Sequence, residues 1–261
     1  MNILGKAFRL FGVGMPVVVL VTGMILAVSM HLSVKEAGAQ GGALECMFRA
    51  EGSRQFMFRS GKVDGNVLVD HALYNGKVYG FGQVNMLQGD IVLYDGKSYL
   101  ALPELTKPVV EEREGLKAVF LAYGSSEIWQ EIPIEYELFG MDEVEEYVVE
   151  NAKAYNTSLE EMFVFRIEGP VEYLKYGVIR KDLTDSTRHT PGGHSSATIE
   201  YELEKENVNI VGAWAGKGNN GSYTERTENM RMYMINEAHD KAGHIENIHI
   251  LPGAKLYWPN C

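Results

Sequence analysis

Residues 230–249, MRMYMINEAHDKAGHIENIH, predict the β-hairpin on which the interpretation of the whole chain depends. The first six residues alternate as a strand does, a polar loop follows, and a second strand begins at His244. Because successive side chains of a strand point to opposite faces, Arg231 and Tyr233 share one face and the methionines share the other. The methionine face is expected to pack into the core. Arg231, Tyr233 and His244 are then expected to face a common cleft.

Short alternating runs separated by glycine-containing turns extend outward from this hairpin over most of the chain. The Asp64-Gly65 and Asp95-Gly96 pairs are typical of tight hairpin turns. Residues 141–155 instead repeat apolar side chains at helical spacing and predict an amphipathic helix. We therefore expect an α+β fold, mostly β, with two packed mixed or antiparallel sheets and one clear helix. The expected strands, with a turn at 204–207 between the last two, are 55–59, 66–73, 80–85, 91–94, 97–102, 116–123, 162–167, 173–179, 198–203 and 208–214.

The N-terminal residues have the layout of an export signal. Lys6 and Arg9 precede an apolar run at 11–30, and the small-residue site Ala37-Gly38-Ala39 follows. Residues 1–39 are therefore predicted to be a signal peptide, with an uncleaved membrane anchor as the alternative because the apolar run is long. A secreted or periplasmic location follows. Residues 40–261 are expected to form one domain, or two that divide near residue 158.

Charge and cysteine content narrow the classes of partner. The chain has 24 Lys and Arg against 35 Asp and Glu, a net charge of −11, which argues against nucleic acid and anionic membranes. Its two cysteines, Cys46 and Cys261, lie near the two ends of the predicted mature region. In an oxidising compartment they can pair, and two free thiols are the alternative.

Several stretches resemble, in order, motifs of the acetolactate decarboxylase family. GFGQVNMLQGD at 80–90, followed by YDGKSY at 94–99, is similar to the family's G-x-G-x-x-N-x-L-x-G-E run and its later D-G-x-x-Y. FVFRIEG at 163–169 is similar to the strand F-Y-A-I-R-I-D-G, and NIVG at 209–212 to the strand T-I-V-G-F. The resemblance rests on the joint order of these motifs and covers nearly everything from residue 46 onward.

The resemblance implies a zinc-dependent lyase that decarboxylates 2-acetolactate to acetoin. In that family the hairpin carries an H-x-H pair on its first strand and a third histidine on the return strand, which suits tetrahedral zinc with one open position. Here His244 matches the third ligand, whereas Arg231 and Tyr233 fall on the first two. Asp90 falls on the family's glutamate and is the expected catalytic residue. The family's Thr-Arg pair falls on Tyr176-Gly177, so its arginine is missing.

These departures predict that the family's zinc site is degraded. An arginine stays protonated and cannot ligate a metal, and a neutral tyrosine is a poor zinc ligand. The cofactor is therefore left unknown, with zinc not expected in the family's manner. A site rebuilt from the histidines of the last third is an alternative, although none has H-x-H or H-x-x-x-H spacing. His189 and His239 lie in polar stretches that predict exposure.

Two functions from different classes follow. In the first, the guanidinium of Arg231 binds a small carboxylate, Tyr233 adds a hydrogen bond, and the protein is a non-catalytic binding or interaction protein. The competing interpretation of Arg231 is a salt bridge to Asp90 or another acid that only fills a dead site. In the second, the protein is a diverged carboxy-lyase that still forms acetoin. The residues favour the first function.

Overall fold

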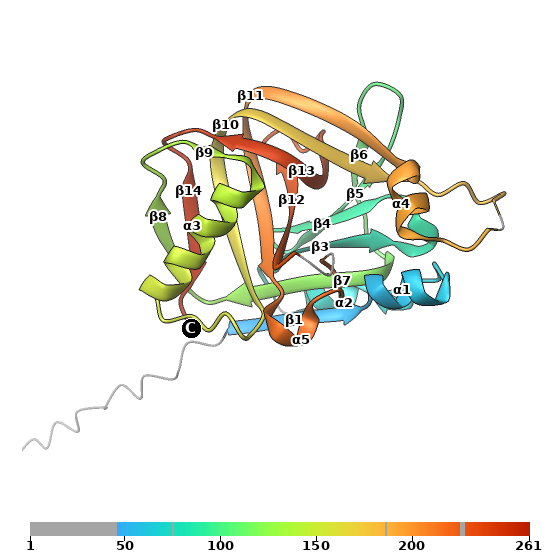
Figure 1. The fold of residues 1–261 in the computed structure, drawn as a ribbon, viewed down its shortest axis with the longest axis horizontal. Coiled ribbons are helices and arrows are strands. Elements are labelled where there is room, and N and C mark those ends of the chain that lie inside the picture. Colours follow the sequence, from blue (N-terminus) through green and yellow to red (C-terminus); the bar gives the residue numbers. More distant parts are fainter. Residues whose placement is uncertain (1–45, 75, 186, 225–227) are drawn as a thin grey trace, which may run out of the picture. The chain divides into compact units, whose positions relative to one another are not determined.

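The two expected sheets are present in the computed structural model (Figure 1), which describes residues 46–74, 76–185, 187–224 and 228–261. Each sheet has seven strands, and the strand pairings among the described residues are antiparallel. The predicted mostly-β class with two packed sheets is therefore confirmed, and the sheets are antiparallel rather than mixed. The predicted signal peptide at 1–39 lies outside the described residues.

The first sheet comes from the N-terminal half of the described chain and has the strand order β1-β7-β3-β4-β5-β6, with β2 paired to β7. The turn between β4 and β5 has positive φ at both central residues, 50° at Asp95 and 78° at Gly96. This is the backbone that the Asp-Gly pair predicts, because a two-residue hairpin turn of this type needs left-handed residues. The strands are β1 (Cys46–Gly52), β2 (Val67–Leu68), β3 (Tyr79–Val84), β4 (Asp90–Tyr94), β5 (Lys97–Leu102), β6 (Val109–Glu112) and β7 (Lys117–Ser126).

The second sheet has the order β8-β14-β10-β11-β12-β13-β9. An additional pairing of β10 with β13 closes β10, β11, β12 and β13 into a ring of four strands. The predicted hairpin at 230–249 is the β12–β13 part of this ring, so its two strands are held from both sides. The strands are β8 (Trp129–Pro133), β9 (Leu138–Phe139), β10 (Phe163–Ile179), β11 (Thr198–Trp214), β12 (Met230–Asn236), β13 (Ala242–Ile250) and β14 (Lys255–Pro259).

The predicted helix is α3 (Gly140–Ala154), one residue from the expected bounds at each end. Its buried residues are Val144, Tyr147, Val148 and Ala152, the apolar face that the spacing indicated. Asp142 and Glu143 lie in its first turn, where a carboxylate interacts favourably with the positive end of the helix dipole. The shorter helices are α1 (Arg54–Ser60), α2 (Val69–Leu73), α4 (Pro191–Ala197), α5 (Gly216–Asn219) and the 3-10 turn η1 (Asn85–Leu87).

Two predicted strands are wrong, because residues 55–59 lie in α1 and most of 66–73 lies in α2. In α1 the Ser53 side chain accepts a hydrogen bond from the Phe56 N–H, and Gly61 at φ 72° closes the C-terminal end. A capping serine and a left-handed glycine spaced in this way favour a helix. These local signals outweigh the short apolar alternation from which the strands were predicted.

The predicted turn at 204–207 is also wrong, since β10 and β11 are each one continuous strand. Glu204 pairs with Tyr173, and Glu206 pairs with Val171, so the strands stay aligned across the polar segment. Lys205 has a positive φ of 54° and forms an ion pair of 3.6 Å with Glu172. The segment is polar because it lies on an exposed part of a long ribbon, and its polarity does not mark a chain reversal.

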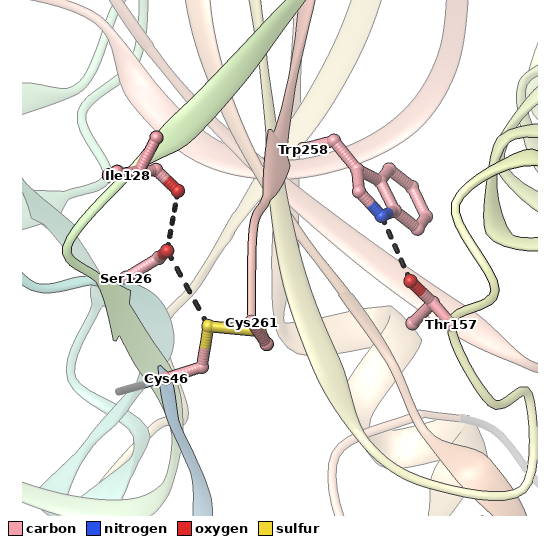
Figure 2. Close-up of a disulfide and its surroundings, with 6 residues drawn as sticks. All are labelled: Cys46, Ser126, Ile128, Thr157, Trp258 and Cys261. Carbon is pink, nitrogen blue, oxygen red and sulfur yellow. Dashed lines mark hydrogen bonds between the residues drawn. A yellow bond between two sulfur atoms is a disulfide. The ribbon is translucent and has the colours of Figure 1, made fainter. Parts of the chain in front are cut away.

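A disulfide joins Cys46 at the start of β1 to Cys261 just after β14 (Figure 2), with the two Cα atoms 5.4 Å apart. The predicted pairing is therefore present. Nearby, the Trp258 indole N–H donates to the Thr157 hydroxyl at 3.0 Å. The bond thus ties β1, an edge strand of the first sheet, to the C-terminal end of β14 in the second sheet. Among the described residues, no helix is long and apolar enough to cross a membrane.

The largest core cluster is shared by both sheets and α3. At its centre, the ring of Phe81 on β3 stacks on the ring of Tyr233 on β12, with centroids 4.5 Å apart and planes 6° from parallel. Both side chains are fully buried. This stack places the predicted hairpin directly against β3 and β4 of the other sheet.

Candidate functional site

The hairpin residues singled out in the sequence lie together between the sheets. Tyr233 pairs directly with His244 across β12 and β13, and their rings are 5.7 Å apart. The Arg231 guanidinium lies 5.8 Å from the Tyr233 ring. Because Tyr233 stacks on Phe81, all three residues belong to the side of the hairpin that meets the first sheet. Each is at most 8% exposed.

Asp90, the first residue of β4, reaches the same place from the opposite sheet. Its Oδ2 lies 2.6 Å from His244 Nδ1, and His244 Nε2 lies 2.9 Å from Glu246 Oε1. Carboxylate oxygens accept, so both ring nitrogens donate and the imidazole carries a proton. Burial alone would lower the pKa of His244, but the charge of Asp90 and the hydrogen bonds to both carboxylates outweigh burial and raise it. The hydrogen bond from His244 in turn lowers the pKa of Glu246.

The missing family arginine has a structural explanation at Gly177. A Cβ atom built on Gly177 would lie 2.8 Å from His244 Nε2 and 2.5 Å from Thr198 Cγ2. Both distances are well inside van der Waals contact, so no side chain fits at this position while His244 keeps its place. The ring of His244 therefore fills the space into which a residue at position 177 would project.

Arg231 does not form the salt bridge to Asp90 that one interpretation predicted, because Asp90 is engaged by His244. Among the described residues Arg231 forms an ion pair with Glu228, with 3.8 Å between Nη1 and Oε2, and the Glu228 side chain is 45% exposed. An ion pair of that length on a half-exposed acid is weak. The pairing with "another acid" is thus present only in this loose form.

Buried polar atoms without a hydrogen-bond partner among the described residues gather around this cluster. They include the Tyr233 hydroxyl, Arg231 Nε, Asp90 Oδ1 and Gln83 Oε1. Gln83 pairs with Asp90 in the β3–β4 register, so the four atoms come from three neighbouring strands. A buried polar group left unpaired costs about 1–3 kcal/mol, which is offset where a polar molecule supplies the missing bonds. The burial of Tyr233, with the nearby charge of Asp90, raises the pKa of its phenol, so the hydroxyl remains a donor.

The sequence analysis did not predict a pair of buried histidines, His194 and His189, that lies behind Gln83. Its amide nitrogen lies 3.2 Å from His194 Nε2, and His194 Nδ1 lies 3.0 Å from His189 Nε2. The prediction that His189 is exposed is wrong, because it is 3% exposed, and His194 is 4% exposed. Burial lowers the pKa of both imidazoles, and the charge of Arg54 adds to the effect at His194.

A local sequence signal, the start of α4, could have indicated where His194 lies. Thr190 caps α4 by accepting from the Gly193 N–H, and Pro191 occupies the first turn. A capping threonine followed by proline predicts a helix start, which fixes the direction of the His194 side chain. Arg54 and Glu246 also join the cluster and were not singled out from sequence, Arg54 because α1 was predicted as a strand.

Zinc does not fit the residues present here. Arg231 is a cation and Tyr233 a protonated phenol, so of the three positions matched to the family's ligands only His244 offers an imidazole nitrogen to a metal. Within the described part of the chain, no three His, Cys, Asp or Glu side chains are grouped so as to hold a metal ion. The arrangement is instead suited to donating hydrogen bonds and positive charge to an anion.

Known proteins similar to this chain match most of its described residues. The sequence profile described as Alpha-acetolactate decarboxylase matches residues 54–259. The crystal structure of alpha-acetolactate decarboxylase from Bacillus subtilis strain 168 is similar with a TM-score of 0.65 at 15% identity, over 81% of this chain and 84% of that one. A protein of unknown function similar to alpha-acetolactate decarboxylase from Staphylococcus aureus gives a TM-score of 0.63 at 14% identity, over 80% and 83%. A search of curated proteins found no match.

Proposed function

The chain belongs to the alpha-acetolactate decarboxylase family, and from this premise we propose that its site binds a small carboxylate without the family's zinc chemistry. The resemblance puts two of the three zinc ligands at Arg231 and Tyr233. A buried guanidinium at that place keeps a positive charge where the family has a dication. In this proposal the site still binds a small carboxylate, as the family does, but it no longer carries out metal-assisted decarboxylation.

The observation that carries the proposal is the set of unpaired buried polar atoms at Arg231 and Tyr233. Arg231 Nε has no hydrogen-bond partner among the described residues, and the Tyr233 hydroxyl, which lies beside the Arg231 side chain, keeps a proton that it can donate. A carboxylate accepts from two donors at once and forms charge-assisted bonds with a guanidinium. The charge of His244 is balanced by Asp90 and Glu246, which leaves the Arg231 guanidinium as the group that would bind the carboxylate. The expected ligand is a small hydroxy- or keto-acid.

Export of the protein is part of the proposal. Residues 1–39 have the composition of a signal peptide. The Cys46–Cys261 disulfide supports it, because such bonds persist mainly in oxidising compartments. The protein would then meet its ligand in the periplasm or outside the cell.

Continued formation of acetoin from 2-acetolactate is the second candidate. Decarboxylation leaves an electron pair on carbon that must receive a proton, and His244 is protonated beside Asp90. This favours some residual lyase activity with His244 as the proton source. An acetoin-forming assay on the purified protein distinguishes this candidate from binding alone.

The proposed function is tested by titrating the purified protein with pyruvate and with lactate. Binding is measured by calorimetry or by ligand-observed NMR. Arg231→Gln is expected to weaken binding about 10- to 100-fold, since a charge-assisted hydrogen bond contributes about 1.5–3 kcal/mol. Arg113→Gln, which removes the same charge from an exposed position just after β6, is the control and should bind as the wild type does. Binding that is equally strong in Arg231→Gln would contradict the proposal.

A further inference from the structure

A cavity of about 520 Å³ lies over α1 and α4, outside the buried cluster. We call it the outer pocket, and its lining residues are Gln55, Phe58, Arg59, Arg188, Pro191 and Thr224, together with Gly221. Figure 1 shows α1 and α4 at the same end of the two sheets. The pocket is distinct from the carboxylate site of the proposed function, since neither Arg231 nor Tyr233 lines it.

Two guanidinium groups give the outer pocket a positive charge. The side chain of Arg188 donates to the backbone carbonyls of Phe58 and Arg59, which are at the C-terminal end of α1 where a cation is favoured. Neither Arg59 nor Arg188 forms an ion pair with an Asp or Glu among the described residues, and both residues are exposed. On a chain with a net charge of −11, two uncompensated arginines beside one cavity form a local attractor for anions.

The ring of Phe58 links the outer pocket to the buried histidines. Phe58 lines the pocket, and its ring lies 5.4 Å from the ring of His194 and 5.2 Å from the guanidinium of Arg54. On the far side, His194 contacts Gln83, which is opposite Asp90 in the sheet register. The charge of Arg54 also acts on Tyr233 and Glu246. Arg54 thus contacts Phe58 of the outer pocket and acts electrostatically on two residues of the buried cluster.

From this geometry we infer that the outer pocket is the entrance to the carboxylate site, with Arg59 and Arg188 capturing the anion and Phe58 acting as the gate. The passage of the anion from the pocket to Arg231 rests on the proposed function. The binding of an anion in the pocket depends only on Arg59 and Arg188. The ligand class is a small monocarboxylate, because the pocket offers cations for one charged group and the apolar ring of Phe58 for the rest.

The experiment has two arms on the full protein. In the first, inorganic phosphate is titrated while backbone NMR signals are followed. Signals of Arg59 and Thr224 are expected to shift in the wild type and not in Arg59→Gln/Arg188→Gln. The control Lys62→Gln/Arg113→Gln removes the same charge from exposed positions outside the pocket and should respond as the wild type does. An absence of any phosphate shift at the pocket in the wild type would overturn anion capture.

In the second arm, association and dissociation rates of pyruvate are measured by NMR line shapes. Arg59→Gln/Arg188→Gln should slow association about fivefold or more and leave dissociation within about twofold, because steering acts on encounter. Phe58→Ala should speed both rates and leave the dissociation constant nearly unchanged. Phe58→Leu tests the same gate with a smaller change to the packing against His194.

The outcomes separate this inference from the proposed function. If Arg231→Gln abolishes pyruvate binding while the Phe58 and Arg59/Arg188 variants keep wild-type rates, the entrance is wrong and the proposed function stands. If binding depends on Arg59 and Arg188 but not on Arg231, the outer pocket is the final site, which overturns both the gate and the proposed function. A wild type that binds phosphate but not pyruvate contradicts the proposed function and retains only anion capture.

Discussion

At the level of single residues, the absence of a side chain at Gly177 leaves the space that the His244 ring occupies. The His244 ring lies where a Cβ at position 177 would be, and Asp90 and Glu246 hold the ring there through its two nitrogens. A side chain at 177 would therefore displace the residue that the hairpin and β4 share. This explains in physical terms why the family's arginine and the present position of His244 do not coexist.

Gly177→Ala is accordingly expected to lower the free energy of unfolding by about 1–3 kcal/mol, the usual cost of overpacking a filled core. The added methyl group would lie 2.5 Å from Thr198 Cγ2 and 2.8 Å from His244 Nε2. Urea denaturation measures the change. Gly218→Ala is the matched control, since nothing lies within 4 Å of its Cβ position. Equal stability of the two variants would show that His244 is not packed against Gly177.

At the level of elements, α1 and α4 line the outer pocket that we infer to be the entrance to the site. Neither helix was predicted from the sequence. The hairpin, the β4–β5 turn and α3 could be predicted, because each has a strong local signal of alternation, turn residues or helical spacing. The short helices could not, since seven residues carry too few apolar positions to separate the two periods. Their capping residues, Ser53 and Thr190, were the available signal.

The His194–His189 pair of α4 makes stability depend on pH. Burial lowers the pKa of His194 in the folded protein, whereas the unfolded chain keeps the ordinary value of 6.5. As pH falls below 6.5, the unfolded state takes up a proton that the folded state does not, so stability decreases with decreasing pH. This loss amounts to about 1–2 kcal/mol between pH 7 and pH 5 for one imidazole.

His194→Gln should therefore lose less stability than the wild type between these two pH values, whatever its absolute stability. Urea midpoints at pH 7 and pH 5 for both proteins give the comparison. His244 titrates with the opposite sign because its pKa is raised, and it is present in both proteins, so its contribution cancels. Parallel losses in the two proteins would mean that His194 takes up its proton equally well in the folded and unfolded states, so that burial does not lower its pKa.

For the whole molecule, the disulfide and the site depend on contacts that no local pattern contains. The bond spans 215 residues and links β1 of the first sheet to the end of β14 in the second sheet. The pairing of Asp90 with His244 spans 154 residues and brings the two sheets together at the site. Asp90, Arg231, Tyr233 and His244 could be selected from the family resemblance. Their arrangement could not, because the protonation of His244 and the freedom of Arg231 from Asp90 follow only from the packing of the sheets.

In the proposed function, the family's metal-binding hairpin has become an anion-binding hairpin. Its most direct test is the zinc content of the purified protein, compared with that of Arg231→His/Tyr233→His, after both are incubated with zinc and desalted. The double variant restores an H-x-H pair opposite His244, so it is expected to retain zinc, while the wild type should retain close to none. A wild type that retains stoichiometric zinc and forms acetoin from 2-acetolactate would contradict the claim.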